Sequence, residues 1–268
     1  MSEPPITGRE APPELAPNLP LARRFLATHP PPGDLLLCGL TGSHIYGFPS
    51  ADSDLDLKGI HLAPTHSLLG LRPVPESHDR IVVFEGVECD VTTQEARKAL
   101  ELLLKGNGNM LERILSPIQV VDTPHVAELQ ALAQRAICRR FVRHYQGFFR
   151  GRCREHSKAP KATAKNLLYA YRVALTGIHL LRTGALEADV TVLGPRYGFP
   201  LTVELAQFKQ QAQEKAAVPA ELDQAARADW PSLEQGLRDA LAASPLPEDP
   251  GSEAACHDWL VRTRKATL

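Results

Sequence analysis

The sequence predicts an α+β fold in which a half that mixes strands and helices is followed by an all-helical half. Short apolar runs of strand length, bounded by Gly, Pro and Asp, occur only in the first half and end with the segment 118–122. From residue 125 onward, apolar residues recur instead at the three- and four-residue spacing of amphipathic helices. We therefore place a domain boundary between residues 124 and 125.

The first half begins with a proline-rich segment. Residues 1–20 contain six prolines and few large apolar side chains, so we expect a flexible arm there and a first domain over 21–124. A short helix from Leu21 is stopped by Pro30. The remaining elements expected in this half are strands at 34–40 and 55–62, two strands around Gly86, a helix at 94–105 capped by Thr92 or Thr93, a helix at 109–115 and a strand at 118–122.

The second domain, over 125–268, is expected to contain helices only. They are predicted near 125–137, 139–150, 161–183, 202–216, 220–243 and 253–266, with a loop at 194–200.

The composition is ordinary for a globular protein, with 268 residues, 43% hydrophobic and 23% charged. No apolar run approaches the ~20 residues of a membrane span. The N-terminus lacks the basic and apolar regions of a signal peptide. The five cysteines are odd in number and scattered, which favours free thiols in a reducing compartment. We therefore expect a cytoplasmic protein.

Charge is distributed unevenly along the chain, although the net charge is only −1. Residues 131–182 hold twelve Lys or Arg and one acid, Glu155, for a net charge of +11. The segments before and after it carry −7 and −5. A basic block between acidic flanks favours a phosphate-rich partner. The alternative is a solvated helix face that lies near an acidic neighbour.

Gly42 and Ser43 follow the expected strand 34–40, and Asp54 and Asp56 lie at the start of the next. Residues two apart in a strand project from the same face, so the two carboxylates share one face. A small-residue turn after a strand presents backbone N–H groups that suit a phosphate. Because carboxylates and phosphates repel unless cations lie between them, the pattern predicts Mg²⁺ and a nucleotide.

Two other kinds of site fit the acidic pair less well. A Ca²⁺ loop that begins at Asp52 needs Gly at its sixth position and Glu at its twelfth, where this chain has Leu57 and Ala63. A phosphatase nucleophile would directly follow a buried strand, whereas residues 48–53 intervene here. The simplest alternative is a pair of solvent-exposed acids at a strand edge.

Asp90 is the candidate third carboxylate. Glu88 and Asp90 share a face of the strand expected after Gly86, and either could reach a metal. Two-metal phosphoryl transfer needs carboxylates for both ions and a base near the attacking hydroxyl. We assign Asp54 and Asp56 to the ions and Asp90 to a metal or to the acceptor hydroxyl. We favour Asp90 over Glu88 because it lies closer to the strand end, although both could be ordinary hairpin residues.

Together, these residues resemble a known superfamily. The pattern Gly42-Ser43-x10-Asp54-x-Asp56, with Asp90 on a later strand, resembles the DNA polymerase β-like nucleotidyltransferases. Residues 42–60 are also similar to a narrower bacterial and phage family of nucleotidyltransferases associated with RNA ligases. Matches to that family continue at 104–115, 165–172 and 181–184, and the whole resemblance covers residues 34–185.

The resemblance implies a small mixed β-sheet core with flanking helices, dependence on Mg²⁺, and transfer of a nucleoside monophosphate from an NTP. It also implies that Gly42 and Ser43 contact phosphate and that Asp54, Asp56 and Asp90 hold the metal ions. It does not define the acceptor.

Two groups of basic residues follow. Lys158, Lys161, Lys165 and Arg172 are spaced for one helical face, and we expect Lys161, Lys165 and Arg172 to neutralise the triphosphate. Arginines at 135–154 alternate with aromatic residues, a mixture that suits single-stranded RNA. The alternatives are a solvated basic face for the first group and an amphipathic helix with buried aromatics for the second.

The resulting hypothesis is a nucleotidyltransferase in which an acceptor hydroxyl, on RNA, attacks the α-phosphate of an NTP such as ATP and releases pyrophosphate. The cofactor is two Mg²⁺ ions, with Mn²⁺ as a substitute. One alternative is a nucleotidyltransferase that acts on a small molecule or a protein, including toxin-like enzymes. Another is a non-catalytic module that binds nucleotide or RNA.

Overall fold

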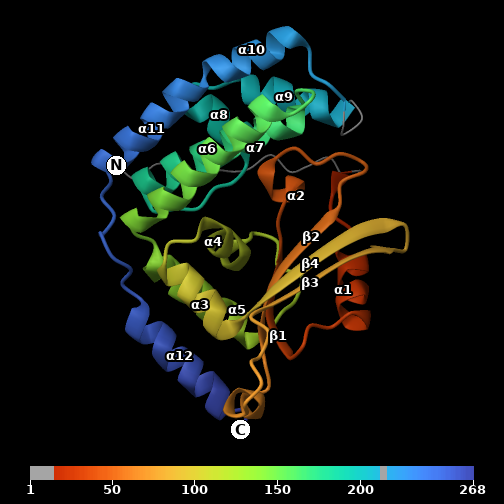
Figure 1. Cartoon of the computed structure of the whole chain (residues 1–268), viewed down its shortest axis with the longest axis vertical. Coiled ribbons are helices and arrows are strands. Elements are labelled where there is room, and N and C mark those ends of the chain that lie inside the picture. The colour runs from red at the N-terminus through yellow and green to blue at the C-terminus, as the bar shows by residue number, and fades with distance from the viewer. Residues whose placement is uncertain (1–14, 212–215) are drawn as a thin grey trace. The chain divides into compact units, whose positions relative to one another are not determined.

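The computed structural model describes residues 15–211 and 216–268 (Figure 1). The chain divides into two compact units, each assembled from separate segments. The described residues of the sheet unit are 17–42, 54–141 and 246–268, and those of the helical unit are 15–16, 43–53, 142–211 and 216–245.

The sheet unit contains one mixed four-stranded sheet in the order β1-β2-β4-β3. Its strands are β1 (Asp34–Leu40), β2 (Leu55–Leu62), β3 (Ser77–Phe84) and β4 (Val87–Glu95). β2 pairs in parallel with β4, and the other two pairings are antiparallel. The mixed sheet and its helices confirm the predicted α+β class.

The hairpin between β3 and β4 turns at Glu85 and Gly86, which both have positive φ, at 49° and 83°. Two such residues form the primed turn whose twist matches that of the flanking strands. Phe84 and Val87 are therefore register partners, and the register of the whole hairpin follows from this turn.

One face of the sheet packs against α1 (Leu19–Thr28), whose Leu21 and Phe25 join Leu57 and Val91 in a buried apolar cluster (Figure 1). Helices α3 (Ala96–Leu104), α4 (Gly108–Leu115) and α5 (Pro124–Ala136) complete this part of the unit, together with the short 3-10 helices η2 (Thr65–Leu69) and η3 (Arg139–Phe141). The C-terminal α12 (Glu253–Lys265) packs against α3 and α5 and is held by an Arg264–Glu95 ion pair of 2.6 Å.

The helical unit is built around α7 (Ala164–Thr183), whose residues from 170 to 181 are all buried. Its N-cap is Thr163, and Gly184 closes it in the left-handed conformation with φ 73°. The helices around it are α6 (Val142–Lys158), α8 (Val190–Arg196), α9 (Leu201–Gln211), α10 (Ala220–Ala228) and α11 (Trp230–Ala242), and the unit also contains the short α2 (Ser43–Tyr46). None of the described helices is long and apolar enough to span a membrane.

Several predicted element boundaries are wrong. Strand β4 continues to Glu95, which caps α3 in place of Thr92 or Thr93. Segment 118–122 forms only an isolated bridge between Gln119 and Gly39. Part of the loop expected at 194–200 belongs to α8. The helix expected at 220–243 is divided at Asp229, and a new helix begins at Trp230 with Pro231 in its first turn.

Residues 1–14 of the expected arm lie outside the described residues. The functional boundary at 124/125 stays a prediction, since the compact units follow packing and place α5 and α12 with the sheet.

Candidate active site

Asp56 and Asp90 are register partners in the parallel β2–β4 pairing, so they lie side by side on the sheet. Neighbouring strands are about 4.8 Å apart, which brings the two carboxylates to one place. Leu55 and Leu57 project to the opposite face and are buried in the apolar cluster with α1. Asp54 directly precedes β2, two residues from Asp56. The alternation of this strand thus leaves the acids on the polar face.

Gly42 lies against the Asp56 carboxylate. Its φ is +73°, and a Cβ atom built there would lie 1.9 Å from Oδ2 of Asp56. The neighbouring Thr41 N–H donates to the Asp56 carbonyl at 2.8 Å. Glycine is therefore required at position 42 for its backbone conformation and for the space that the carboxylate occupies.

Lys58 places a cation on the third acid. Its Nζ lies 2.8 Å from Oδ2 of Asp90 and 3.3 Å from the Thr92 hydroxyl. The side chains of Lys58 and Asp90 are 20% and 30% exposed. β2 is an inner strand, so neither Asp56 nor Lys58 is a strand-edge residue. The polar face of the sheet therefore carries the two carboxylates and the Lys58 ammonium group, which is paired with Asp90.

The carboxylate oxygens on this face of the sheet are suitable ligands for a divalent cation. Carboxylate oxygens are the ligands that Mg²⁺ prefers, and Asp90 already attracts a positive charge from Lys58. Within residues 15–211 and 216–268, however, no group of three or more His, Cys, Asp or Glu is arranged to hold a metal. The structure thus brings Asp56 and Asp90 together, while a complete metal site stays a prediction.

The segment between Gly42 and Asp54 belongs to the helical unit and packs against its helices. The guanidinium carbon of Arg172 lies 4.2 Å from the ring centre of Tyr46. Lys209, only 2% exposed, donates from Nζ to the Ser50 hydroxyl at 2.9 Å. At the ends of the segment, the Ser43 and Ser53 hydroxyls are 3.0 Å apart. Arg172 and Lys209 therefore fix the segment that connects the glycine turn to the acids.

A second glycine of this segment, Gly47, lies close to a carboxylate. Gly47 has φ +84°, and a Cβ atom there would lie 1.9 Å from Oδ1 of Asp189. The same Asp189 oxygen accepts from the Thr191 N–H at 2.8 Å and so caps α8. The segment therefore packs closely on the start of α8.

The basic residues predicted to bind triphosphate do not share one helical face. Lys158 ends α6, Lys161 is exposed in the connection, and Lys165 is half-buried in α7. The prediction of one shared helical face is wrong, because α6 stops before Pro160 and Thr163 caps a new helix. Arg172 does lie in α7, but it is 4% exposed.

Acidic side chains from later in the chain pair with much of the basic block. Arg150 binds Glu234 at 2.8 Å, and Arg140 binds Asp249. The aromatic residues Phe141, Tyr145 and Phe149 are buried, as an amphipathic arrangement predicts. Six cations of the block have no ion pair within the described ranges, and they are Arg135, Arg143, Arg154, Lys158, Lys161 and Arg182.

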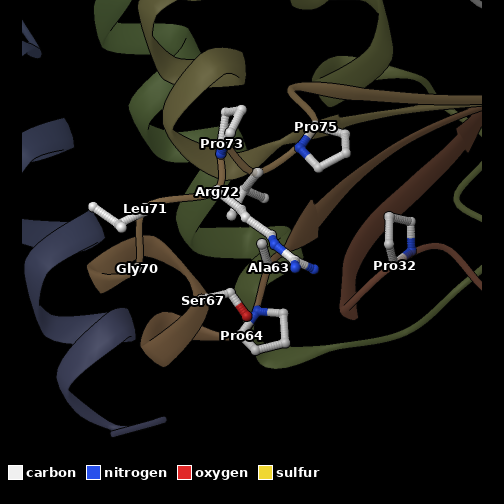
Figure 2. A pocket seen from close by; sticks show the side chains of 10 residues that line it. Pro32, Ala63, Pro64, Ser67, Gly70, Leu71, Arg72, Pro73 and Pro75 are labelled. Carbon is white, nitrogen blue, oxygen red and sulfur yellow. The ribbon is translucent and has the colours of Figure 1, made fainter.

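The sheet unit also has a pocket of about 620 Å³, formed by Pro32 and residues 63–75. Figure 2 shows its proline rings and the side chain of Arg72. Ala63 follows β2 and lies seven residues beyond Asp56, or about 23 Å at ~3.3 Å per residue. The pocket is therefore separate from the carboxylates.

Sequence reasoning missed one residue of the site and did not find the partner of another. It gave Lys209 no role, since one lysine in a helical segment carries no signal that it is buried against Ser50, 159 residues earlier. It also left the partner of Lys58 open, because the β2–β4 register that brings Asp90 near was unknown.

Two curated proteins are similar to part of this chain. The chain is 27% identical over 150 residues to uncharacterized protein MJ0002 of Methanocaldococcus jannaschii, which covers 56% of this chain and 61% of that one. It is 28% identical over 158 residues to uncharacterized protein YcgL of Bacillus subtilis, which covers 57% and 59%. The chain spans about three fifths of the length of these two relatives.

Among solved structures, a nucleotidyltransferase-like protein from Exiguobacterium sibiricum is similar at 14% identity and a TM-score of 0.32, covering 82% of this chain and 74% of that one. The model of one family, described as the RNA repair pathway DNA polymerase beta family, matches residues 24–262. This match covers most of the chain, which therefore belongs to the RNA repair pathway DNA polymerase beta family.

Proposed function

We propose that this protein is a Mg²⁺-dependent enzyme that transfers a nucleoside monophosphate from an NTP to a hydroxyl group of RNA. The observation that carries the proposal is the placement of Asp56 beside Asp90, with Gly42 against the Asp56 carboxylate. In the reaction, the acceptor oxygen bonds to the α-phosphorus. The bond from that phosphorus to the bridging oxygen breaks, and pyrophosphate leaves with the bonding electrons.

Each residue of the site has a role in this proposal. Asp54 and Asp56 would hold Mg²⁺, which when bound neutralises charge on the triphosphate. Asp90 would hold the metal with them and accept the proton of the attacking hydroxyl, and Lys58 orients its carboxylate at 2.8 Å. Backbone N–H groups of Gly42 and Ser43 would bind the β- and γ-phosphates.

The basic residues divide into two roles. Lys161 and Lys165 are assigned to the triphosphate as counter-charges. Arg172 would act through Tyr46, because its guanidinium is buried against that ring. In this proposal residues 21–124 carry the chemistry and 125–268 form the helical domain, although α5 and α12 pack in the sheet unit.

Two observations support RNA as the acceptor. The description of the matched family names an RNA repair pathway. In addition, α6 carries Arg143, Arg154 and Lys158 on one exposed face without acidic partners in the described part of the chain. Cations on one face can neutralise a row of backbone phosphates.

The test is incubation of the purified protein with each α-labelled NTP and Mg²⁺ in the presence of RNA, protein or small-molecule fractions. The proposal predicts label in RNA, equimolar pyrophosphate release, and no transfer in EDTA. Label in a protein or metabolite fraction alone would establish the reaction and contradict the acceptor. Absence of label in every fraction, with NTP binding intact, would indicate a non-catalytic module.

A further inference from the structure

Two exposed apolar side chains extend the row of acids across the sheet. Ile81 of β3 is the register partner of Asp90, and Val83 is the partner of Glu88. Asp56 is the partner of Asp90 on the other side, so the row reads Asp56, Asp90, Ile81. Residues directly opposite in an antiparallel pair have Cβ atoms about 4.5–5.5 Å apart. The Ile81 side chain therefore lies directly beside that of Asp90, the proposed catalytic acid.

These two side chains are unusually open to solvent. Ile81 and Val83 are 67% and 68% exposed, whereas Val82 and Phe84, which alternate with them, pack against the core with α1. β3 is an edge strand of the sheet, and edge strands are commonly protected by charged side chains. A single exposed apolar residue needs no explanation, but two on one strand face beside a row of carboxylates form an apolar ledge.

The order of the strands places the proposed metal ligands on one side of Asp90 and the ledge on the other. The proposed metal ligands Asp54 and Asp56 belong to the β2 side, and Asp90 borders the ledge on the β3 side. A group that reaches Asp90 from the side away from Asp56 lies over Ile81 and Val83. In the proposed reaction the acceptor has that position, because the NTP is held on the Asp56 side.

The chemistry of the ledge fits the end of a nucleic acid strand. The acids of the adjoining rows, Asp56, Glu88 and Asp90, border the ledge together with the Lys58 ammonium on Asp90, and carboxylates repel phosphate groups. A terminal nucleoside carries its hydroxyl on a neutral ribose and presents the flat apolar face of a base. We infer that Ile81 and Val83 form the platform on which the 3′-terminal nucleoside of the RNA acceptor stacks, an inference that rests on the proposed function.

The test compares the wild-type protein with the double variant Ile81→Thr, Val83→Thr, in which both residues stay β-branched and suited to a strand. The probe is a short single-stranded RNA with 2-aminopurine at its 3′ end, and a second RNA carries this base internally. In the swap variant Ile81→Val, Val83→Ile the ledge stays apolar. The matched control is Leu69→Thr, which removes an apolar residue of η2 that is 78% exposed.

The wild-type protein and the swap variant should change the emission of the terminal 2-aminopurine, and the Thr variant should not. In the Thr variant, KM for RNA should rise roughly five- to tenfold, because two apolar side chains no longer cover the base. KM for NTP and the melting temperature should stay as in the wild type, and Leu69→Thr should match the wild type throughout.

Equal emission changes and equal KM for RNA in the wild-type and Thr proteins, with transfer to RNA intact, would overturn the ledge and leave the proposed function standing. Failure of the wild-type protein itself to label RNA would instead overturn the proposed function. A wild-type dimer that the Thr variant converts to a monomer in sedimentation would show that the ledge binds a second copy, which also overturns the inference.

Discussion

Asp56 and Asp90 face each other as register partners across the parallel β2–β4 pairing, although 34 positions separate them in the sequence. The pairing depends on the parallel register, which places Leu55 beside Cys89 and Leu57 beside Val91 in the apolar layer. Because side chains alternate along a strand, burying those four residues directs both acids to the other face. The core of the sheet unit thus fixes the carboxylate pair.

Replacing Gly42 by Ala should impair activity more than stability. The new Cβ would meet the Asp56 carboxylate at 1.9 Å, so that carboxylate must move, and displacement of a catalytic group by about 1 Å can reduce the rate about 100-fold. Gly86→Ala is the matched control, since Gly86 also has positive φ but nothing within 4 Å. Both variants should unfold at a lower temperature, and only Gly42→Ala should lose transfer. Equal loss in the two variants would contradict the steric argument.

Replacing Lys58 by Met should increase the affinity of the protein for Mg²⁺. The Lys58 ammonium competes with a metal ion for Asp90, and a partly exposed ion pair contributes about 1 kcal/mol, or roughly fivefold in affinity. Mg²⁺ titration followed by thermal unfolding measures this affinity. Lys98→Met breaks a comparable ion pair with Glu76 and serves as the control. Unchanged or weaker Mg²⁺ binding in Lys58→Met would show that Asp90 is not a ligand.

Removing charge from the exposed face of α6 should weaken RNA binding in a salt-dependent way. Replacement of Arg154 and Lys158 by Gln removes two cations that have no ion pair within the described residues. For every phosphate that is no longer neutralised, the slope of log affinity against log salt should become shallower by about 0.7. Arg152→Gln, on the same helix but paired with Glu155 at 2.9 Å, is the control. If the double variant and the wild type showed the same slope of log affinity against log salt, this face would be excluded from the RNA site.

His144 should make the protein less stable in mild acid. Burial, with a smaller contribution from the charge of Arg172, lowers the pKa of His144 to about 4 from its ordinary 6.5. The folded state therefore keeps the imidazole neutral while the unfolded state binds a proton, and stability falls as the pH drops from 6.5 toward 4. The loss is at most about 3 kcal/mol.

His144→Phe keeps the stacking on Phe148, whose ring centre is 4.3 Å away, and removes the titrating group. Its melting temperature should fall less than that of the wild type between pH 7 and pH 4.5, and the exposed His257→Gln should behave as the wild type. Parallel curves for the wild type and His144→Phe would contradict the assigned pKa.

The sequence was sufficient for the parts of the fold that depend on local chemistry. Alternation predicted β2, and Gly86 predicted the hairpin, because turn residues and apolar spacing act over a few positions. Thr92 and Thr93 were expected to cap a helix, but they lie in β4, where pairing with β2 outweighs their capping preference.

The sequence indicated which acids belong to the candidate site, and their roles stay predictions. It indicated the placement of the cations only in part. Asp54, Asp56 and Asp90 follow from strand spacing, whereas the burial of Arg172 against Tyr46 depends on contacts between distant segments. The acids that neutralise Arg140 and Arg150 come from residues 84 and more positions later, so the charge sum of a contiguous block overstated the free positive charge.

The most direct test of the account is transfer of α-labelled nucleotide to RNA by Asp56→Asn, measured beside Asp52→Asn. Asp52 is an exposed acid in the same segment and has no assigned role, so it controls for the loss of one carboxylate. We expect Asp56→Asn to lose transfer by at least about 1,000-fold with its melting temperature nearly unchanged, while Asp52→Asn keeps wild-type activity. Undiminished transfer by Asp56→Asn would contradict the proposal that the Asp56 carboxylate holds the metal for nucleotide transfer.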